Sequence, residues 1–308
     1  SRSQPWKESK EVVGAIDLKK RDELGKLLET MPQEMVMKLI PQFEEAQVHA
    51  AKVHAAEKTG LPDQDRIGEQ GLRQEQDLHL AQDSIRALVF NMERGVYCDA
   101  IIDFLKLCPQ IQPFDLILAN ELDDGCTRSG NRDVAREIGE ALHMHYVFAL
   151  EFIELTQRGA QKGYHGNAIF SRYPIKWAKT LQLPEENNWY FDRQRRIGGR
   201  CAIFAELDVD GKPLGVVSIH LENRTDGQGR LRQMEMVYQE ALRLFEGIPI
   251  LLGGDLNTNG FDGRSNQEIQ EMAKSPDLFQ QRLSRLEEYE PLLAVAGEYG
   301  FAYQGLAC

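Results

Sequence analysis

The hydrophobic pattern of the chain changes at residue 85. Before that point, apolar residues recur at helical spacing in a background rich in Ala, Glu, Gln, Lys and Leu, with few β-branched runs. After it, short apolar runs that end in polar residues alternate with longer amphipathic stretches. We therefore predict a helical N-terminal segment over residues 1–84 and a separate α/β domain over residues 85–308.

The second part of the chain carries the patterns of both strands and helices. Asp210-Gly211 lies between two apolar runs and predicts a tight hairpin. Hairpins mixed with helical crossovers favour an α+β fold, a two-layer β-sandwich flanked by helices, over a purely parallel sheet. Strands are predicted at 85–90, 114–119, 146–150, 167–170, 176–181, 200–208, 214–221 and 248–252, and helices at 96–107, 131–143 and 230–245.

Polar side chains follow five of the predicted strands. Any one such tip is typical of a surface loop, but five tips of the same kind indicate a shared site at one edge of the sheets. Carboxylate and amide oxygens are the ligands that a hard divalent cation prefers, and no quartet of His and Cys residues indicates zinc. The tips are Asn91 with Glu93, Asn120 with Glu121, His165 with Asn167, His220 with Glu222 and Asn223, and Asp255 with Asn257.

The last of these tips ends the apolar run at 248–252. Two glycines allow close approach of backbone or ligand, and the two-residue spacing of Asp255 and Asn257 lets both side chains face one side. A carboxylate there can accept a proton or bind a metal. The alternative is an ordinary strand followed by an Asx turn, in which the aspartate bonds its own backbone.

The composition limits the classes of partner and compartment. A net charge of −12 and a pI near 5.2 argue against broad, charge-driven attachment to nucleic acid or anionic membranes, although a local basic groove is compatible with them. Five cysteines without a Cys-x-x-Cys pair indicate no disulfide framework. With no bilayer-spanning apolar run and no signal peptide at the start, the prediction is a cytoplasmic protein.

The ordered tips resemble those of the endonuclease/exonuclease/phosphatase superfamily of DNase I-like, metal-dependent phosphoesterases. The similarity covers about residues 85–305, in the family's order, and leaves the N-terminal segment outside it. The segments that carry it are Phe90-Asn91-Met92-Glu93, Ala119-Asn120-Glu121-Leu122, the stretch from Gly163 to Ile175, Ser218-Ile219-His220-Leu221-Glu222 and Gly253-Gly254-Asp255-Leu256-Asn257.

The resemblance implies a role for each matching residue. Glu121 corresponds to the main ligand of Mg²⁺ or Mn²⁺, helped by Asn91, and Glu93 to a residue near the metal or its waters. The catalytic positions are Asp255, which binds or activates the attacking water, Asn257, which orients it or the phosphate, His220 near the scissile phosphate, and Tyr164 in a tyrosine-bearing loop. Asn167 matches a phosphate-side contact. Such a set can supply a nucleophilic water and neutralise phosphate charge.

A basic patch interrupts the acidic chain before the strand at 200–208. Its members are Arg193, Arg195, Arg196 and Arg200, and we predict that the first three bind a phosphate-rich substrate. The alternative is a solvated loop. The preceding aromatic residues 189–191 fit either stacking on a base or burial.

The resemblance also implies a closing Ser-Asp-His signature, which the sequence does not contain. We expect a further C-terminal piece to supply it, together with the missing strands of the 85–308 domain. The predicted function is a metal-dependent phosphodiesterase or nuclease. The alternatives are a phosphatase of phospholipid or sugar-phosphate headgroups and an inert family member that acts as a binding module. Residues 1–84 are a candidate surface for a protein partner or self-association.

Overall fold

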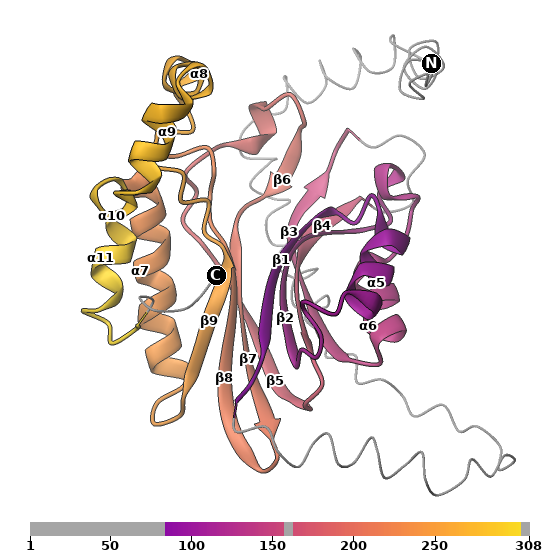
Figure 1. The fold of residues 1–308 in the computed structure, drawn as a ribbon. Helices are drawn as coiled ribbons and strands as arrows, with labels where there is room; N and C mark the ends of the chain where they lie inside the picture. Colours follow the sequence, from indigo (N-terminus) through magenta and orange to yellow (C-terminus); the bar gives the residue numbers. More distant parts are fainter. Residues whose placement is uncertain (1–83, 157–162, 303–308) are drawn as a thin grey trace, which may run out of the picture. The chain divides into compact units, whose positions relative to one another are not determined.

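The computed structural model describes residues 84–156 and 163–302, and all of them belong to one compact unit. Within these residues the strands form two sheets (Figure 1). The predicted N-terminal helices lie outside the described residues. Across the described ranges, no helix combines the length and apolarity needed to cross a bilayer.

The first sheet has the order β1-β2-β4-β3-β6. β1 and β2 run parallel, whereas β2, β4, β3 and β6 pair antiparallel to their neighbours. The parallel pair places Asn91 beside Asn120 near the carboxyl ends of both strands. The strands are β1 (Ala87–Arg94), β2 (Leu116–Asp124), β3 (His145–Glu154), β4 (Tyr164–Ser171) and β6 (Arg196–Gly198).

The second sheet has the order β5-β7-β8-β9. β7 pairs antiparallel with β5 and β8, and β8 runs parallel to β9, so that His220 lies beside Asp255. Asp210 and Gly211 both have positive φ in the turn between β7 and β8, which confirms the predicted hairpin. The strands are β5 (Ile175–Gln182), β7 (Cys201–Val209), β8 (Lys212–His220) and β9 (Ile250–Asp255).

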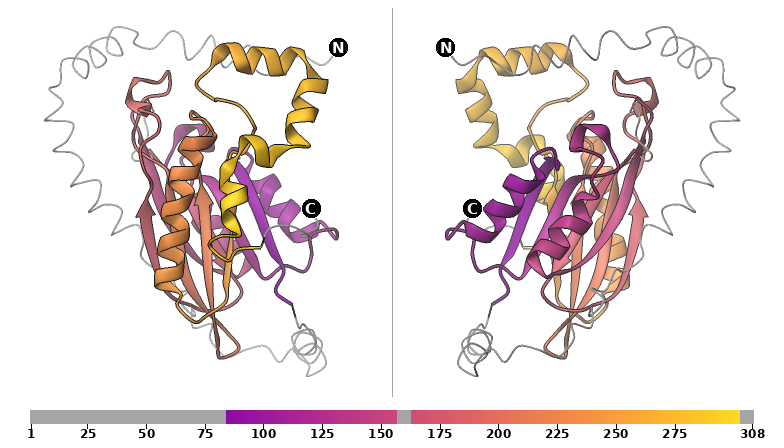
Figure 2. Two further views of the ribbon diagram at one scale, coloured as in Figure 1. Left: turned by 90° about the vertical axis from the view of Figure 1, so that its left-hand side faces the viewer. Right: turned by 90° about the vertical axis from the view of Figure 1, so that its right-hand side faces the viewer.

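Helices cover the outer faces of both sheets (Figures 1 and 2). α5 (Cys98–Leu107) and α6 (Val134–Leu142) pack on the first sheet, and α7 (Gly227–Leu244) and α11 (Pro291–Ala296) pack on the second. Asp133 caps α6 by accepting a hydrogen bond from the Arg136 backbone N–H. The chain between β9 and α11 contains α8 (Asn266–Lys274), α9 (Pro276–Leu283) and α10 (Leu286–Tyr289).

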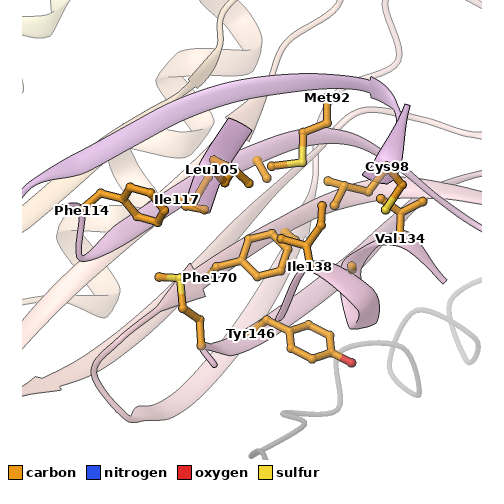
Figure 3. Close-up of a cluster of buried hydrophobic side chains, with 14 residues drawn as sticks. Met92, Cys98, Leu105, Phe114, Ile117, Val134, Ile138, Tyr146 and Phe170 are labelled. Carbon is orange, nitrogen blue, oxygen red and sulfur yellow. The ribbon is translucent and has the colours of Figure 1, made fainter. Parts of the chain in front are cut away.

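Three hydrophobic layers hold this arrangement together. The middle layer lies between the sheets and includes Leu118, Ile169, Ile203 and Val216. One outer layer lies under α7 and α11. The other lies under α5 and α6, where Figure 3 shows aromatic and aliphatic side chains from both sheet and helices interlocking. Its labelled members are Met92, Cys98, Leu105, Phe114, Ile117, Val134, Ile138, Tyr146 and Phe170.

The two-layer sandwich with flanking helices confirms the predicted fold class. Each predicted strand and helix of the second part is present, with boundaries shifted by a few residues. The short β6 and the helices α8 to α11 are additions that the sequence pattern did not reveal. Residues 301–302 have no regular secondary structure.

Candidate active site

Backbone irregularities mark the sheet edge where the polar tips meet. The pairing of β1 with β2 shifts between Asn91 and Arg94, and the pairing of β2 with β4 shifts between Ala119 and Leu122. Glu93, Arg94, Glu121 and Asn257 all have positive φ, between 45° and 68°. Such conformations of residues other than glycine are strained and persist where the surroundings hold them, often at functional sites.

The first contact of the site joins the two sheets at their edge strands. Asn91 Nδ2 donates a hydrogen bond of 2.9 Å to Asp255 Oδ2. The other carboxylate oxygen, Asp255 Oδ1, accepts the backbone N–H of Asn257 at 3.0 Å, which is the Asx turn considered for this segment. The Asx turn therefore uses one oxygen of Asp255, and the other oxygen contacts Asn91 of the opposite sheet.

The two glycines before Asp255 are required by close packing. A Cβ on Gly254, whose φ is 140°, would lie 1.9 Å from the Ile219 carbonyl oxygen, and one on Gly253 would lie 2.9 Å from a Leu118 methyl group. Side chains at these positions would push β9 away from β8 and from the first sheet. The glycines thus allow Asp255 to approach the tips of the opposite sheet.

Asn120 forms a buried bridge beneath this contact. Its Oδ1 accepts the Asp255 backbone N–H at 2.8 Å, and its Nδ2 donates to Asn167 Oδ1 at 3.1 Å and to the Ile219 carbonyl at 3.0 Å. Asn167 is fully buried. Its primary contact is therefore with Asn120, and it links β2 and β4 to the end of β9.

His220 lies at the end of β8 in a buried charged cluster. Its Nδ1 is 3.0 Å from Glu151 Oε2, and its Nε2 is 3.9 Å from Asp255 Oδ2. Arg200 Nη1 lies against the ring, 2.9 Å from each ring nitrogen, and 3.4 Å from Glu151 Oε2. A carboxylate partner on Nδ1 fixes that nitrogen as a donor and leaves Nε2 facing Asp255.

Two carboxylates of the site, those of Glu151 and Glu121, are held in their ionised form. Burial acts to raise the pKa of Glu151, but His220 and Arg200 outweigh it and lower that pKa to about 2. Burial also acts to raise the pKa of Glu121, and the nearby His165, His220, Arg200 and Arg94 lower it overall. A negative Glu121 at neutral pH is the state that a metal ligand requires.

The oxygen donors at the open side of the site fit a hard cation. The side chain of Glu121 is 25% exposed, that of Asp255 is 29% exposed, and Asn91 and Glu93 are exposed. Across the described ranges, no group of three or more His, Cys, Asp or Glu side chains forms a metal cage. Mg²⁺ commonly uses one or two carboxylates together with water and substrate phosphate, so an open set around Glu121 is compatible with it.

Tyr164 is not part of this cluster. It begins β4, three residues before Asn167 on a regular strand, and alternation therefore turns the two side chains to opposite faces. Asn167 faces the second sheet, and Tyr164 faces the side of α5 and α6. The half-buried Tyr164 contributes its backbone carbonyl as acceptor to the Cys126 thiol.

The arginines of the basic patch differ in environment. Arg193 is exposed and Arg195 half-buried. Arg196 is 6% exposed and lies between two rings, 3.9 Å from the Phe152 centroid and 3.8 Å from that of Trp189. Burial and neighbouring Arg200 lower the pKa of Arg196 to about 10. Of the four arginines in the predicted patch, Arg193 therefore faces solvent, whereas Arg196 and Arg200 are buried and brace the structure.

Glu151 is the site residue that the sequence analysis missed. It follows an apolar run, at 146–150, as the other polar tips do. It lacks the second polar residue that marks the other tips, so the sequence pattern did not single it out. The pairing of β3 with β4 shifts between Leu150 and Phe152, and this irregularity surrounds Glu151. Arg200 belonged to the predicted patch, and its contact with His220 follows from the antiparallel pairing of β7 with β8, which sets the residue before β7 beside the end of β8.

Comparisons with known proteins place these features in a family. A family model described as the Endonuclease/Exonuclease/phosphatase family matches residues 88–268, more than half of the chain. The Escherichia coli (strain K12) protein named "Uncharacterized protein YbhP" is 30% identical over 96 residues, which are 31% of this chain and 34% of that protein. The Shigella flexneri protein of that name gives the same values. The match thus spans about a third of these curated relatives' length.

Solved structures match the chain at lower identity. The endonuclease/exonuclease/phosphatase of Beutenbergia cavernae has a TM-score of 0.44 and 19% identity, over 61% of this chain and 53% of that one. The human Nocturnin catalytic domain has a TM-score of 0.42 and 18% identity, over 63% of this chain and 69% of that one.

Proposed function

We propose, from the premise that this chain belongs to the endonuclease/exonuclease/phosphatase family, that it is a metal-dependent phosphodiesterase of the nuclease type. Family membership supports a hydrolase of phosphoesters in general, and the site residues carry the finer proposal. The central observation is that Asp255 lies within 2.9 Å of Asn91 and 3.9 Å of His220, so that an ionisable carboxylate from one sheet meets an amide from the other.

The protein groups can divide the chemistry of phosphodiester hydrolysis among them. Asp255 Oδ2 is the acceptor for a proton of the attacking water, and Asn91 Nδ2 holds that oxygen in place. The Asn257 backbone N–H fixes the other oxygen, and its Nδ2 donates to the Leu221 carbonyl at 2.8 Å. The carboxylate orientation is thus set before substrate arrives, which lowers the reorganisation needed in the reaction.

Arg200 provides positive charge next to the His220 ring, whose Nε2 lies 3.9 Å from Asp255 Oδ2. Glu151 pairs with Nδ1 of His220 and balances the charge of Arg200, and the Nε2 side of the ring faces Arg200 Nη1 and Asp255. Arg200 Nε is buried and makes no hydrogen bond, but it lies 3.5 Å from Glu222 Oε2, with which it forms an ion pair. His220 and Arg200 are suited to bind the non-bridging oxygens of a phosphate.

Glu121, with Asn91 and Glu93 near it, would hold Mg²⁺ or Mn²⁺. A bound divalent ion supplies charge neutralisation on the phosphate and lowers the pKa of a coordinated water. Asn167 supports this position indirectly, because its Oδ1 accepts the Glu121 backbone N–H at 3.4 Å as well as Asn120 Nδ2.

A nucleic acid strand is the substrate that the surroundings of the site favour. Trp189 Nε1 donates to Glu222 Oε2 at 2.7 Å, and Glu222 lies 3.5 Å from Arg200 Nε, so the turn at 189–191 is anchored close to the site. Phe191 at its end is 77% exposed, and the exposed Arg193 follows. An aromatic face beside a guanidinium suits a base and its phosphate.

Replacement of Asp255 by Ala tests the assignment. With Mg²⁺ or Mn²⁺ present, the variant should lose turnover of a generic phosphodiester, while its melting temperature stays near that of the wild type because Asp255 is partly exposed. An unchanged rate would exclude Asp255 as the acceptor. Comparing a single-stranded oligonucleotide with a phospholipid headgroup as substrate then separates the nuclease from the headgroup phosphatase.

A further inference from the structure

We propose that the buried Arg230–Glu290 pair is a positioning device for the loop 256–263, which carries Asn257. The proposal rests on the proposed function, since the pair acts by holding Asn257 and Asp255 in position. Arg230 lies in the first turn of α7, and Glu290 precedes α11, 60 residues later. Neither residue belongs to the cluster around Asp255.

The guanidinium of Arg230 contacts three segments of the chain. Its Nε and Nη2 donate to the two carboxylate oxygens of Glu290 at 2.8 Å and 2.6 Å. Its Nη1 donates to the Thr225 carbonyl at 3.0 Å. Nη2 also reaches the loop, at 3.2 Å from the Phe261 carbonyl and 3.4 Å from Asn259 Oδ1. The planar fork of an arginine is needed to serve all of these acceptors at once.

The carboxylate of Glu290 holds the loop from the other side. Its Oε1 accepts the Gly260 backbone N–H at 3.0 Å, and the Gly260 carbonyl accepts Arg282 Nη1 at 2.8 Å. Gly260 has a φ of 73° and so needs the freedom of glycine. The loop is therefore fixed through its backbone on both sides, by residues of α7, α9 and the turn before α11.

The Arg230–Glu290 pair and its bonds to the loop 256–263 form a clamp. This clamp acts on the residues of the site through a short stretch of chain. Asn257, three residues before Gly260, is held at a φ of 49°, which a neighbouring structure must stabilise. Further along, a Cβ on Gly263 would lie 1.8 Å from the Asn223 carbonyl oxygen, so the far end of the loop packs directly on the chain after His220. With both ends fixed, the Arg230–Glu290 pair determines where the middle of the loop lies.

Stability alone gives little reason for this pair. Both side chains are fully buried, and a buried ion pair is often no better than well-packed apolar residues of similar size. Arg230 also lies at the N-terminal end of α7, where the helix dipole disfavours a positive charge. What apolar replacements cannot reproduce are the directed bonds to Gly260, Asn259 and Phe261.

The double variant R230M/E290L tests the proposal because it removes both charges together and leaves no unpaired charge buried. We expect its melting temperature to remain near that of the wild type. Amide hydrogen exchange in 256–263 should become faster, most of all at Gly260, and kcat should fall by about 10²-fold with KM little changed, as a displacement near 1 Å can cause. The control R243A, an exposed arginine at the other end of α7, should change neither exchange nor kcat.

R230K is the second variant, and it retains the charge but not the fork. It should stay folded and show intermediate loop exchange and intermediate kcat. Wild-type exchange in 256–263 in both variants would overturn the proposal, as would faster exchange with an unchanged kcat. The exchange readout does not need activity. If the wild-type protein hydrolyses no phosphodiester, the proposed function fails. The clamp would still be supported if amide exchange in 256–263 is slow in the wild type and faster in the two variants.

Discussion

Asn91 Nδ2 and Asp255 Oδ2 lie 2.9 Å apart and join the edge strand of one sheet to the edge strand of the other. A hydrogen bond to a charged group contributes about 1.5–3 kcal/mol. Asn91→Ala should therefore lower kcat by about 10-fold to 100-fold by freeing the carboxylate of Asp255, and should barely change the melting temperature because Asn91 is exposed. Steady-state kinetics with Gln110→Ala, another exposed amide, as control would reveal any general effect of the substitution.

Glu121 should determine metal affinity. Calorimetric titration with Mg²⁺ or Mn²⁺ should show binding to the wild-type protein and much weaker binding to Glu121→Gln, which keeps the shape of the side chain but loses its charge. Since the pKa of Glu121 is lowered, wild-type affinity should stay constant from neutral pH down to the ordinary range of a glutamate. Glu298→Gln, at an exposed position, is the control. Equal affinity of the two variants would remove Glu121 from the metal site.

The Glu151–His220–Arg200 cluster should make the stability of the protein depend on pH in the acidic range. The pKa of Glu151 is about 2 in the folded protein against an ordinary value of 4.5. A depressed carboxyl pKa contributes stability that is complete above the unfolded value and is lost as the pH falls through the folded one. The melting temperature should therefore drop between about pH 4.5 and about pH 2.

Glu151→Gln tests the source of that drop. The variant should be less stable at neutral pH, because Arg200 and His220 lose their buried counter-charge, and its acid-induced decrease should be shallower than that of the wild type. Thermal melts across this pH range check both points. A variant as steep as the wild type would mean that other carboxyl groups cause the acid transition.

The arginines of the basic patch should separate into binding and structural residues. Arg193→Ala should weaken binding of a single-stranded oligonucleotide and reduce the salt slope of binding by about one, without loss of stability. Arg196→Ala should instead lower the free energy of unfolding by about 2 kcal/mol, since a desolvated cation–π contact is lost from between Phe152 and Trp189. Fluorescence anisotropy and chemical denaturation measure the two effects, with the exposed Arg136→Ala as control.

The strand and helix pattern from residue 85 onward is local information, and it predicted the sandwich and its flanking helices. β6 is too short to give a periodic signal, and helices α8 to α11 are short and broken by Ser275 and Pro291. The boundary at residue 84, the roles of residues 1–84, the closing signature and the cytoplasmic location remain predictions.

For the site, the sequence by itself determined which strands end in polar residues, because a polar tip after an apolar run is visible in one dimension. Only the tertiary structure decided which tips meet. Bulges and left-handed residues turn Glu121 and Glu151 toward the site. Arg196 was predicted to bind substrate and is instead enclosed by two rings. These outcomes depend on register and on the packing of one sheet against the other, and neither is encoded in the spacing of residues along a single strand.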